Sequence, residues 1–300
     1  MRGMDSTDRE ATLTLPLDRW DGPFPAPLQA AALAALEAGQ VLLLPALGFA
    51  LTAAEHTLLT AGTLDDTRKN ISFDPASGSI HGTALEGEER LRLAAMLDRF
   101  GGQTAALLRG LLPRYAPVLE RARTSFRPAE IAGRSYAARK DDTRLHVDAF
   151  PTRPMRGRRI LRAFANIAPD GAPRDWRVGE PFADFAPKFL PRVRSAWPGQ
   201  NWLLQHLGLT KGRRAPYDVL MLGLHDAAKS DSAWQATTPA TALSFAPGTV
   251  WICFTDMVLH AAMAGHCALE QTFHVPAAAM AAPKLAPLAV LERLTGRTLV

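Results

Sequence analysis

The sequence predicts a mainly β protein with flanking helices, an α+β fold with a jelly-roll core. From about residue 120, short strand-like runs are separated by Pro, Gly and Asp, a texture typical of sandwiches, barrels and jelly rolls. Helical patterns lie before and after this region. The hydrophobic content of 47% supplies a core for the 300-residue chain. Because no low-complexity linker divides the sequence, we expect a single domain over residues 1–300.

The N-terminal part, residues 1–120, is expected to be largely helical. An alanine- and leucine-rich pattern predicts a helix over 26–39, and a short apolar run predicts a strand over 41–44. A long helical pattern covers 87–112, where the adjacent glycines Gly101 and Gly102 predict a break or kink.

The jelly-roll core is expected over 121–276 and a helical tail over 277–300. Alternating polar and apolar residues predict a strand over 144–150, which Pro151 ends. Further strands are predicted at 161–167, 219–224, 242–245, 249–254 and 268–275. The tail should contain a helix over 284–296 that its final glycine caps.

Cysteine content and hydropathy predict a cytoplasmic protein. Two cysteines, Cys253 and Cys267, cannot form a disulfide framework, which favours a reducing compartment. The start of the chain is polar and does not resemble a secretory signal. The most apolar segment, 41–52, contains Pro45 and is too short to span a bilayer.

Positive charge is concentrated in one part of the chain. The stretch from Arg121 to Arg162 contains twelve basic and four acidic residues. A basic cleft raises the local concentration of anionic substrates. No helix-turn-helix, zinc-finger or other nucleic-acid signature accompanies the charge, so we expect no nucleic-acid partner.

The motif His146-Val147-Asp148 is the strongest candidate for chemistry. Residues two apart on a strand share a face, so these two side chains can meet one ligand. A further histidine, for which His260 is the main candidate, would complete a 2-His-1-carboxylate triad. Such a triad holds Fe(II) on one side and leaves the opposite coordination positions open.

Other interpretations of this motif remain open from the residues alone. Zinc also binds two histidines and a carboxylate, and a strand can carry an ordinary hydrogen-bonded His–Asp pair. His56 and His81 fall in the N-terminal part and are expected to be unrelated to the site. Four other histidines compete with His260 for the third ligand position: His206, His225, His266 and His274.

Longer strings around these residues resemble a known family. The order of HxD, a Pro-Gly turn, a Trp-containing strand and a distal His is similar to that of the Fe(II)/2-oxoglutarate oxygenases. Three strings, 139–151, 217–226 and 269–273, resemble the bacterial hydroxylases of 3-deoxy-D-manno-oct-2-ulosonic acid (Kdo), as does the ending at 291–296.

The resemblance implies a double-stranded β-helix, a cupin-like jelly roll, that binds Fe(II) through His146, Asp148 and His260. It implies 2-oxoglutarate as co-substrate and O₂ as oxidant, with no catalytic side chain beyond the metal ligands. The implied reaction hydroxylates Kdo at C3 to give Ko in the lipid A inner core of lipopolysaccharide.

One departure from the family pattern concerns the 2-oxoglutarate carboxylate. Many relatives place an Arg or Lys about ten residues after the distal His, but 261–275 contains neither, and Gln271 stands near that place. A guanidinium binds a carboxylate in a two-point geometry. We predict Arg162 as the partner of the distal carboxylate, with Arg127 as a second candidate and Gln271 as a polar helper.

Basic residues near the motif suggest how an anionic glycolipid is recognised. Lys140, Arg144 and Arg159 are predicted to bind the Kdo-containing lipid A precursor. Such a substrate also implies peripheral contact with the inner face of the inner membrane. The alternatives are a 2-oxoglutarate oxygenase acting on another anionic metabolite or protein, and a non-catalytic glycan-binding jelly roll.

Overall fold

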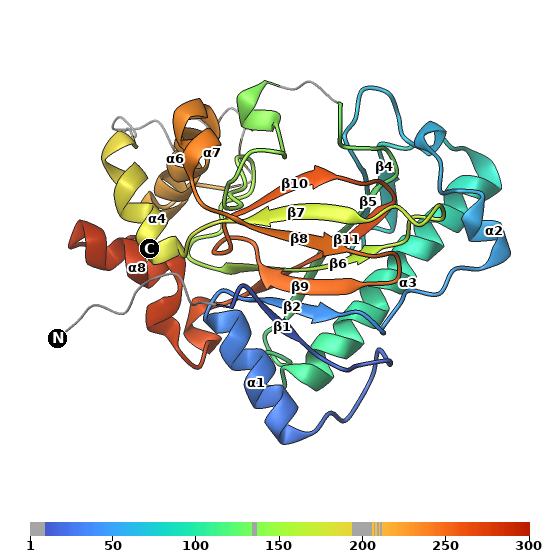
Figure 1. Ribbon diagram of the computed structural model, residues 1–300, viewed down its shortest axis with the longest axis horizontal. Helices are drawn as coiled ribbons and strands as arrows, with labels where there is room; N and C mark the ends of the chain where they lie inside the picture. The colour runs from blue at the N-terminus through green and yellow to red at the C-terminus, as the bar shows by residue number, and fades with distance from the viewer. Residues whose placement is uncertain (1–9, 134–136, 194–205, 207, 209, 211) are drawn as a thin grey trace.

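Two β-sheets packed face to face form the centre of the molecule, and helices surround them (Figure 1). The structure is a computed structural model that describes residues 10–133, 137–193, 206, 208, 210 and 212–300. The larger sheet has eight strands, in the spatial order β1 (Thr12–Thr14), β2 (Val41–Leu44), β9 (Val250–Phe254), β6 (Arg159–Asn166), β11 (Ala268–Val275), β5 (Glu120–Arg127), β3 (Ile71–Asp74) and β4 (Ser79–His81). The smaller sheet has three, in the order β10 (His260–Ala264), β7 (Arg174–Val178) and β8 (Thr241–Phe245).

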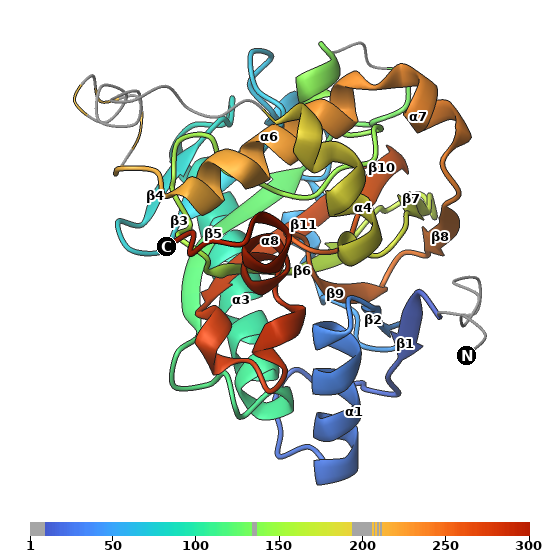
Figure 2. The same ribbon diagram turned by 90° about the vertical axis from the view of Figure 1, so that its left-hand side faces the viewer.

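Six helices of the described residues fall into two groups. α1 and α3 cover the outer face of the larger sheet, while α4, α6, α7 and α8 gather beside one end of the sheets (Figures 1 and 2). With the short α2 included, the helix bounds are α1 (Ala26–Glu37), α2 (Ala53–His56), α3 (Gly87–Leu111), α4 (Phe182–Phe189), α6 (Pro216–Ser230), α7 (Ser232–Thr237) and α8 (Pro287–Thr295). Single 3₁₀ turns occur at η1 (Ala61–Thr63), η2 (Ala138–Lys140), η3 (Leu190–Arg192), η4 (Ala277–Ala279) and η5 (Pro283–Leu285).

The chain passes between the two sheets as a jelly roll requires. From β5 it runs to an extended segment beside β10 in the smaller sheet, then to β6 in the larger sheet and β7 and β8 in the smaller one. β9, β10 and β11 then alternate between the sheets, and the pairs among these strands are antiparallel. The predicted fold class, mainly β with flanking helices around a jelly-roll-like core, is confirmed.

An aromatic layer lies between the two sheets. Side chains alternate along β7, so Trp176 and its neighbours two residues away are buried. Trp176 packs edge-on to Phe164 of β6, and Phe245 stacks on Trp251 with ring centroids 4.0 Å apart. Two rings of this layer, those of Trp176 and Trp251, also line the site described below.

Several predicted elements are confirmed, whereas the strand predicted over 219–224 is wrong. The helices over 26–39 and 87–112 and the strand over 268–275 are present as α1, α3 and β11. The run 219–224 is helical and belongs to α6, because its buried residues Leu220, Leu224 and Ala228 recur every four positions along one face.

Gly101 and Gly102 do not break α3, which is continuous from Gly87 to Leu111. A Cβ at Gly101 would lie 2.1 Å from Nη2 of Arg121 and 2.4 Å from Oε1 of Gln271. The absence of a side chain at Gly101 therefore lets Arg121 and Gln271 of the larger sheet pack close to α3.

Residues 1–120 contribute strands to both edges of the larger sheet. β1 and β2 extend one edge, and β3 and β4 extend the other edge beyond β5. These strands have only three or four residues each, too few for a clear periodic signal in the sequence. No helix among the described residues is long and apolar enough to cross a bilayer.

Candidate active site

His146 pairs with His260, the first residue of β10, through an antiparallel bridge at the edge of the smaller sheet. The amide of each donates to the carbonyl oxygen of the other, at 3.0 and 2.9 Å. The predicted strand over 144–150 is reduced to this single antiparallel bridge, although Asp148 N also donates to Thr255 O at 2.8 Å. Asp148 follows two residues after His146 on the same side. One ligand atom from each of the three side chains lies within 4.8 Å of the others.

Both histidines are held in the tautomer that suits a metal ligand. Nδ1 of His146 lies 2.7 Å from Arg144 O, and Nδ1 of His260 lies 2.8 Å from Val258 O. A carbonyl oxygen can only accept, so each Nδ1 carries the proton and each Nε2 offers a lone pair. Burial lowers the pKa of both rings, which keeps them neutral.

Aromatic neighbours fix the two rings further. The indole of Trp176 stacks on the ring of His260, with centroids 5.1 Å apart and planes 22° apart. His225, from α6, packs edge-on against His146 at 5.3 Å. His225 was a competing ligand in the sequence, but the described residues that cluster as a candidate metal site are His146, Asp148 and His260.

The Asp148 carboxylate is oriented by an arginine. Its Oδ1 lies 3.8 Å from Nε2 of His146, and its Oδ2 lies 3.1 Å from Nη1 of Arg162. Burial alone would raise the pKa of Asp148, but the charge of Arg162 lowers it below the ordinary value. The carboxylate is therefore ionised, with one oxygen held by Arg162 and the other on the histidine side.

A row of paired charges runs beside the triad. Nη1 of Arg162 lies 3.0 Å from Oε1 of Glu270, and Nη2 of Arg127 lies 3.3 Å from Oε2 of the same residue. Arg127 also pairs with Asp142 at 3.5 Å. Glu270 thus faces the pocket at the place on β11 where sequence reasoning looked for a basic residue. Glu270 was not among the site residues predicted from the sequence.

Arg174 differs from the other two pocket arginines. It is 4% exposed and lines the triad pocket, yet it forms no ion pair with any described residue. Its Nη1 donates to Gly265 O at 2.7 Å, whereas its Nε has no partner. Burial and the charge of Arg127 lower the pKa of Arg174 to about 10. Arg174 could have been found from the sequence, because it lies two residues before Trp176 on one strand and so shares its face.

The triad pocket therefore collects hydrogen-bond donors that lack acceptors. Besides Nε of Arg174, the indole nitrogens of Trp176 and Trp251 are buried without a partner, and all three side chains line the pocket. Buried donors in native proteins are nearly always satisfied, so this group indicates a ligand rich in acceptors. Two neutral imidazoles and one carboxylate on one side of the pocket suit Fe(II) with open positions.

The family model of 3-deoxy-D-manno-oct-2-ulosonic acid (Kdo) hydroxylase matches residues 19–298 of this chain. The chain belongs to the Kdo hydroxylase family. Among solved structures it is similar to the Kdo hydroxylase KdoO, described as a non-heme Fe(II) α-ketoglutarate-dependent dioxygenase.

The similarity to KdoO covers nearly both chains. The complex of KdoO with α-ketoglutarate and Fe(III) is 44% identical over 97% of this chain and 98% of that chain, with a TM-score of 0.93. The cobalt(II) complex has the same identity and coverage with a TM-score of 0.94, and the complex with succinate and Fe(III) has a TM-score of 0.92. No curated protein sequence matches the chain significantly.

The residues predicted to bind 2-oxoglutarate in this Kdo hydroxylase family member separate into two groups. Arg162 and Arg127 line the triad pocket. Gln271 lies on the opposite face of β11, where its Oε1 accepts from Thr124 Oγ1 at 2.6 Å and its amide nitrogen donates to backbone carbonyls. Its predicted role as a helper is wrong, because alternation along β11 turns Glu270 to the pocket and Gln271 toward α3.

The predicted substrate residues also differ in placement. Arg159 is fully buried, pairs with Asp256 at 2.7 Å and lies over the ring of Phe254, so its assignment to substrate is wrong. Arg144 donates to Lys229 O at 2.8 Å and so ties the triad segment to α6. Lys140 is exposed on η2, and its role in substrate binding stays a prediction.

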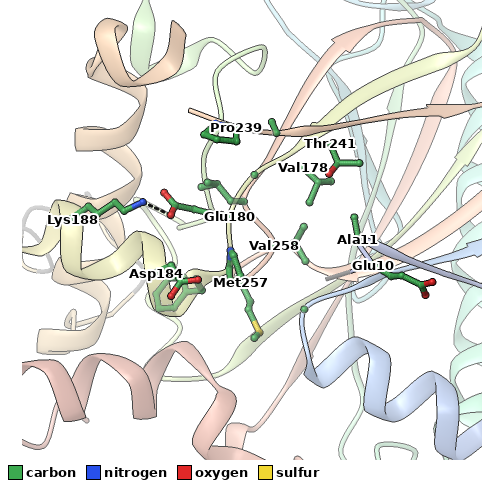
Figure 3. Close-up of a pocket in the computed structure, with 16 residues that line it drawn as sticks. Glu10, Ala11, Val178, Glu180, Asp184, Lys188, Pro239, Thr241, Met257 and Val258 are labelled. Carbon is green, nitrogen blue, oxygen red and sulfur yellow. Dashed lines mark hydrogen bonds and ion pairs between the residues drawn. The ribbon is translucent and has the colours of Figure 1, made fainter. Parts of the chain in front are cut away.

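A cavity of about 590 Å³ elsewhere in the structure does not contain the triad (Figure 3). Val258 and Leu259, just before β10, form one side of it, and the connection from β7 to α4 forms another. Figure 3 shows Lys188 paired with Glu180 at its rim. The residues that line it include neither triad histidine nor Asp148, so cavity size alone would have misplaced the chemistry.

Proposed function

We propose that this protein is an Fe(II)/2-oxoglutarate-dependent dioxygenase that hydroxylates Kdo at C3, giving Ko, in the lipid A inner core of lipopolysaccharide. The observation that carries the proposal is the clustering of His146, Asp148 and His260 in a pocket whose buried donors lack acceptors, in a member of the Kdo hydroxylase family. KdoO, the similar solved protein, is described as binding Fe and α-ketoglutarate.

The triad residues would hold the iron through Nε2 of each histidine and one oxygen of Asp148. Bound Fe(II) would supply the redox chemistry that activates O₂, with 2-oxoglutarate as the source of electrons. In balance, substrate, 2-oxoglutarate and O₂ give hydroxylated substrate, succinate and CO₂. The protein itself fixes the ligands, orients the substrate and excludes water.

We assign the distal carboxylate of 2-oxoglutarate to Arg174 in place of Arg162. Both Arg162 and Arg127 already contact carboxylates of the protein, while Arg174 is a buried guanidinium without one. A carboxylate bound there would also accept from the unpartnered indole nitrogens of Trp176 and Trp251. Arg162 then acts as a positioning residue that holds the second oxygen of Asp148.

The substrate form we propose is a Kdo-containing lipid A precursor at the inner face of the inner membrane. Exposed basic residues of the stretch from Arg121 to Arg162, among them Arg139 and Lys140, support contact with an anionic glycolipid surface. An assay of the protein should therefore supply Kdo-lipid A in lipid vesicles.

The test is aerobic incubation of the protein with Fe(II), 2-oxoglutarate and vesicle-bound Kdo-lipid A. We expect stoichiometric succinate and a mass gain of one oxygen on Kdo, placed at C3 by NMR of the released sugar. Omission of Fe(II) in the presence of a chelator should abolish both products. Succinate without a gain on Kdo would move the protein to another substrate, and wild-type protein without Fe(II) binding would favour a non-catalytic glycan-binding module.

A further inference from the structure

A groove of about 570 Å³ opens beside the triad pocket. Arg127, Arg162 and Glu270 line both spaces and form their common wall. Phe150, two residues after Asp148, also lines the groove, and its ring lies 5.6 Å from the guanidinium carbon of Arg162. A molecule that occupies the groove would therefore lie next to the triad pocket.

The floor of the groove belongs to an extended face of the larger sheet. His81, Ser72, Ser125 and Glu270 are register partners in turn across β4, β3, β5 and β11. All four line the groove. β3 and β4 come from the N-terminal part of the chain, so that part widens the sheet beside the active site. His81, expected from the sequence to be unrelated to the site, lies on this face.

The charges of the groove are mostly positive and only partly neutralised. Five arginines line it, against the single carboxylate of Glu270, which two of those arginines already share. Among the described residues, neither Arg68 nor Arg153 forms an ion pair, and Arg123 approaches Asp74 only at 3.5 Å. Unpaired guanidinium groups around one depression attract an anionic ligand.

Neutral hydrogen-bonding groups lie among these arginines. His274 is 2% exposed, lines the groove, and has no hydrogen-bond partner at either ring nitrogen. Burial lowers the pKa of His274 to about 4, so at pH 7 its ring offers one donor and one acceptor. The hydroxyls of Ser125 and Thr272 line the same space. A buried, unsatisfied histidine beside hydroxyl groups suits a ligand with several hydroxyls.

We propose that this groove binds the acidic sugar of the substrate, with Arg68, Arg123 and Arg153 taking its carboxylate and His274 a sugar hydroxyl. The inference rests on the proposed function and adds to it the place of the sugar. Kdo, an eight-carbon ulosonic acid, combines one carboxylate with several hydroxyl groups, as the lining requires. The phosphates of lipid A share the same anionic chemistry, so the experiment separates the two sources.

The experiment compares Arg153→Ala, Arg68→Ala and His274→Phe with wild-type enzyme. Arg109→Ala is the matched control, since Arg109 is an exposed arginine on α3 outside the groove. Each variant is assayed for kcat and KM with Kdo-lipid A, and for anaerobic binding of Fe(II) and 2-oxoglutarate. Binding of free Kdo and of lipid A without Kdo is measured in parallel by calorimetry.

We expect KM for Kdo-lipid A to rise about 10-fold or more in each groove variant, as for loss of a charged or buried hydrogen bond. Affinity for Fe(II) and 2-oxoglutarate should stay at the wild-type value, which also shows that the variants are folded. His274→Gln, which keeps a donor and an acceptor, should recover part of the loss. Free Kdo should bind wild-type protein and lose affinity in the same variants.

Two outcomes would overturn the inference. Unchanged KM in all three variants of an active enzyme would place the sugar elsewhere and leave the proposed function standing. Groove variants that lose affinity for lipid A without Kdo, but not for free Kdo, would assign the groove to phosphate. Absence of Fe(II)-dependent activity in the wild type would instead refute the proposed function.

Discussion

The triad pocket and the groove share a wall of charged side chains but differ in how their polar groups are partnered. In the pocket, Asp148, Glu270 and Asp142 each pair with an arginine or lysine, and the buried atoms without a hydrogen-bond partner among the described residues are Nε of Arg174, Nε of Arg162, two indole nitrogens and Oδ2 of Asp148. In the groove, Arg68 and Arg153 form no ion pair with any described residue. The pocket is thus preorganised for a metal and one small anion, whereas the groove can accommodate a larger polar ligand.

The residues that would carry the chemistry and those that would recognise the substrate are therefore held by different parts of the fold. Pocket residues are held by backbone bonds and by aromatic stacking, as with Trp176 on His260. Groove residues lie on the widened edge of the sheet, where β3 and β4 supply the floor. Substitutions in the pocket should therefore affect metal and 2-oxoglutarate, and substitutions in the groove should affect the sugar alone.

The largest effect is expected from His260→Ala, which removes a pocket ligand. Hydroxylation should fall by about 1,000-fold or more, because two remaining ligands leave the metal weakly held. Anaerobic titration with Fe(II) measures the loss directly. His56→Ala, at an exposed histidine of α2, is the matched control. Wild-type Fe(II) affinity in His260→Ala would contradict the assignment of the triad.

The next largest effect is expected from Arg174→Ala, and it should differ in kind from the effect of Arg162→Ala. Arg174→Ala should weaken 2-oxoglutarate binding by about 10- to 100-fold, since it deletes a buried charge-assisted contact. Arg162→Ala should act mainly on Fe(II) affinity and kcat, because Arg162 holds Oδ2 of Asp148. Anaerobic titrations with each ligand distinguish the two. A larger loss of 2-oxoglutarate affinity in Arg162→Ala than in Arg174→Ala would reverse the assignment.

The smallest expected effect is on the stability of the protein at low pH, through His274 in the groove. The folded-state pKa of His274 is about 4, below the ordinary 6.5, so the unfolded chain binds more protons between these values. The free energy of unfolding should fall as pH decreases through that window, by about 2 kcal/mol at pH 5 from this residue.

Urea unfolding at pH 7 and pH 5 measures this dependence. His274→Gln should lose that part of the pH dependence, while His56→Gln, at an exposed position, should keep it. An identical pH dependence in His274→Gln and wild type would show that His274 is not held neutral by burial.

The predictions made from the sequence succeeded where the signal was local. A spacing of two on an extended backbone puts His146 and Asp148 on one side whatever the rest of the chain does. Arg162, which was predicted from the sequence to lie at the site, lines the triad pocket from β6. The helical run 219–224 was mistaken for a strand because a short apolar run has no decisive period.

What failed depended on contacts between distant segments. Arg159 pairs with Asp256, 97 positions away, inside the core, so its guanidinium cannot reach a substrate. Gln271 sits one residue from Glu270, and a single step along β11 exchanges the pocket for the α3 side. Neither outcome is visible without the register of β5, β6 and β11.

The jelly-roll class, the HxD pair and the family likeness could be predicted from the residues alone, because these depend on local periodicity and on contiguous strings. The tertiary structure decided which arginine is left without a carboxylate and which side chains share a cavity. It did so because an arginine's role depends on the acids that strand pairing brings within about 4 Å of it. For the same reason, only the fold brought His81 and His274 to one face beside the triad.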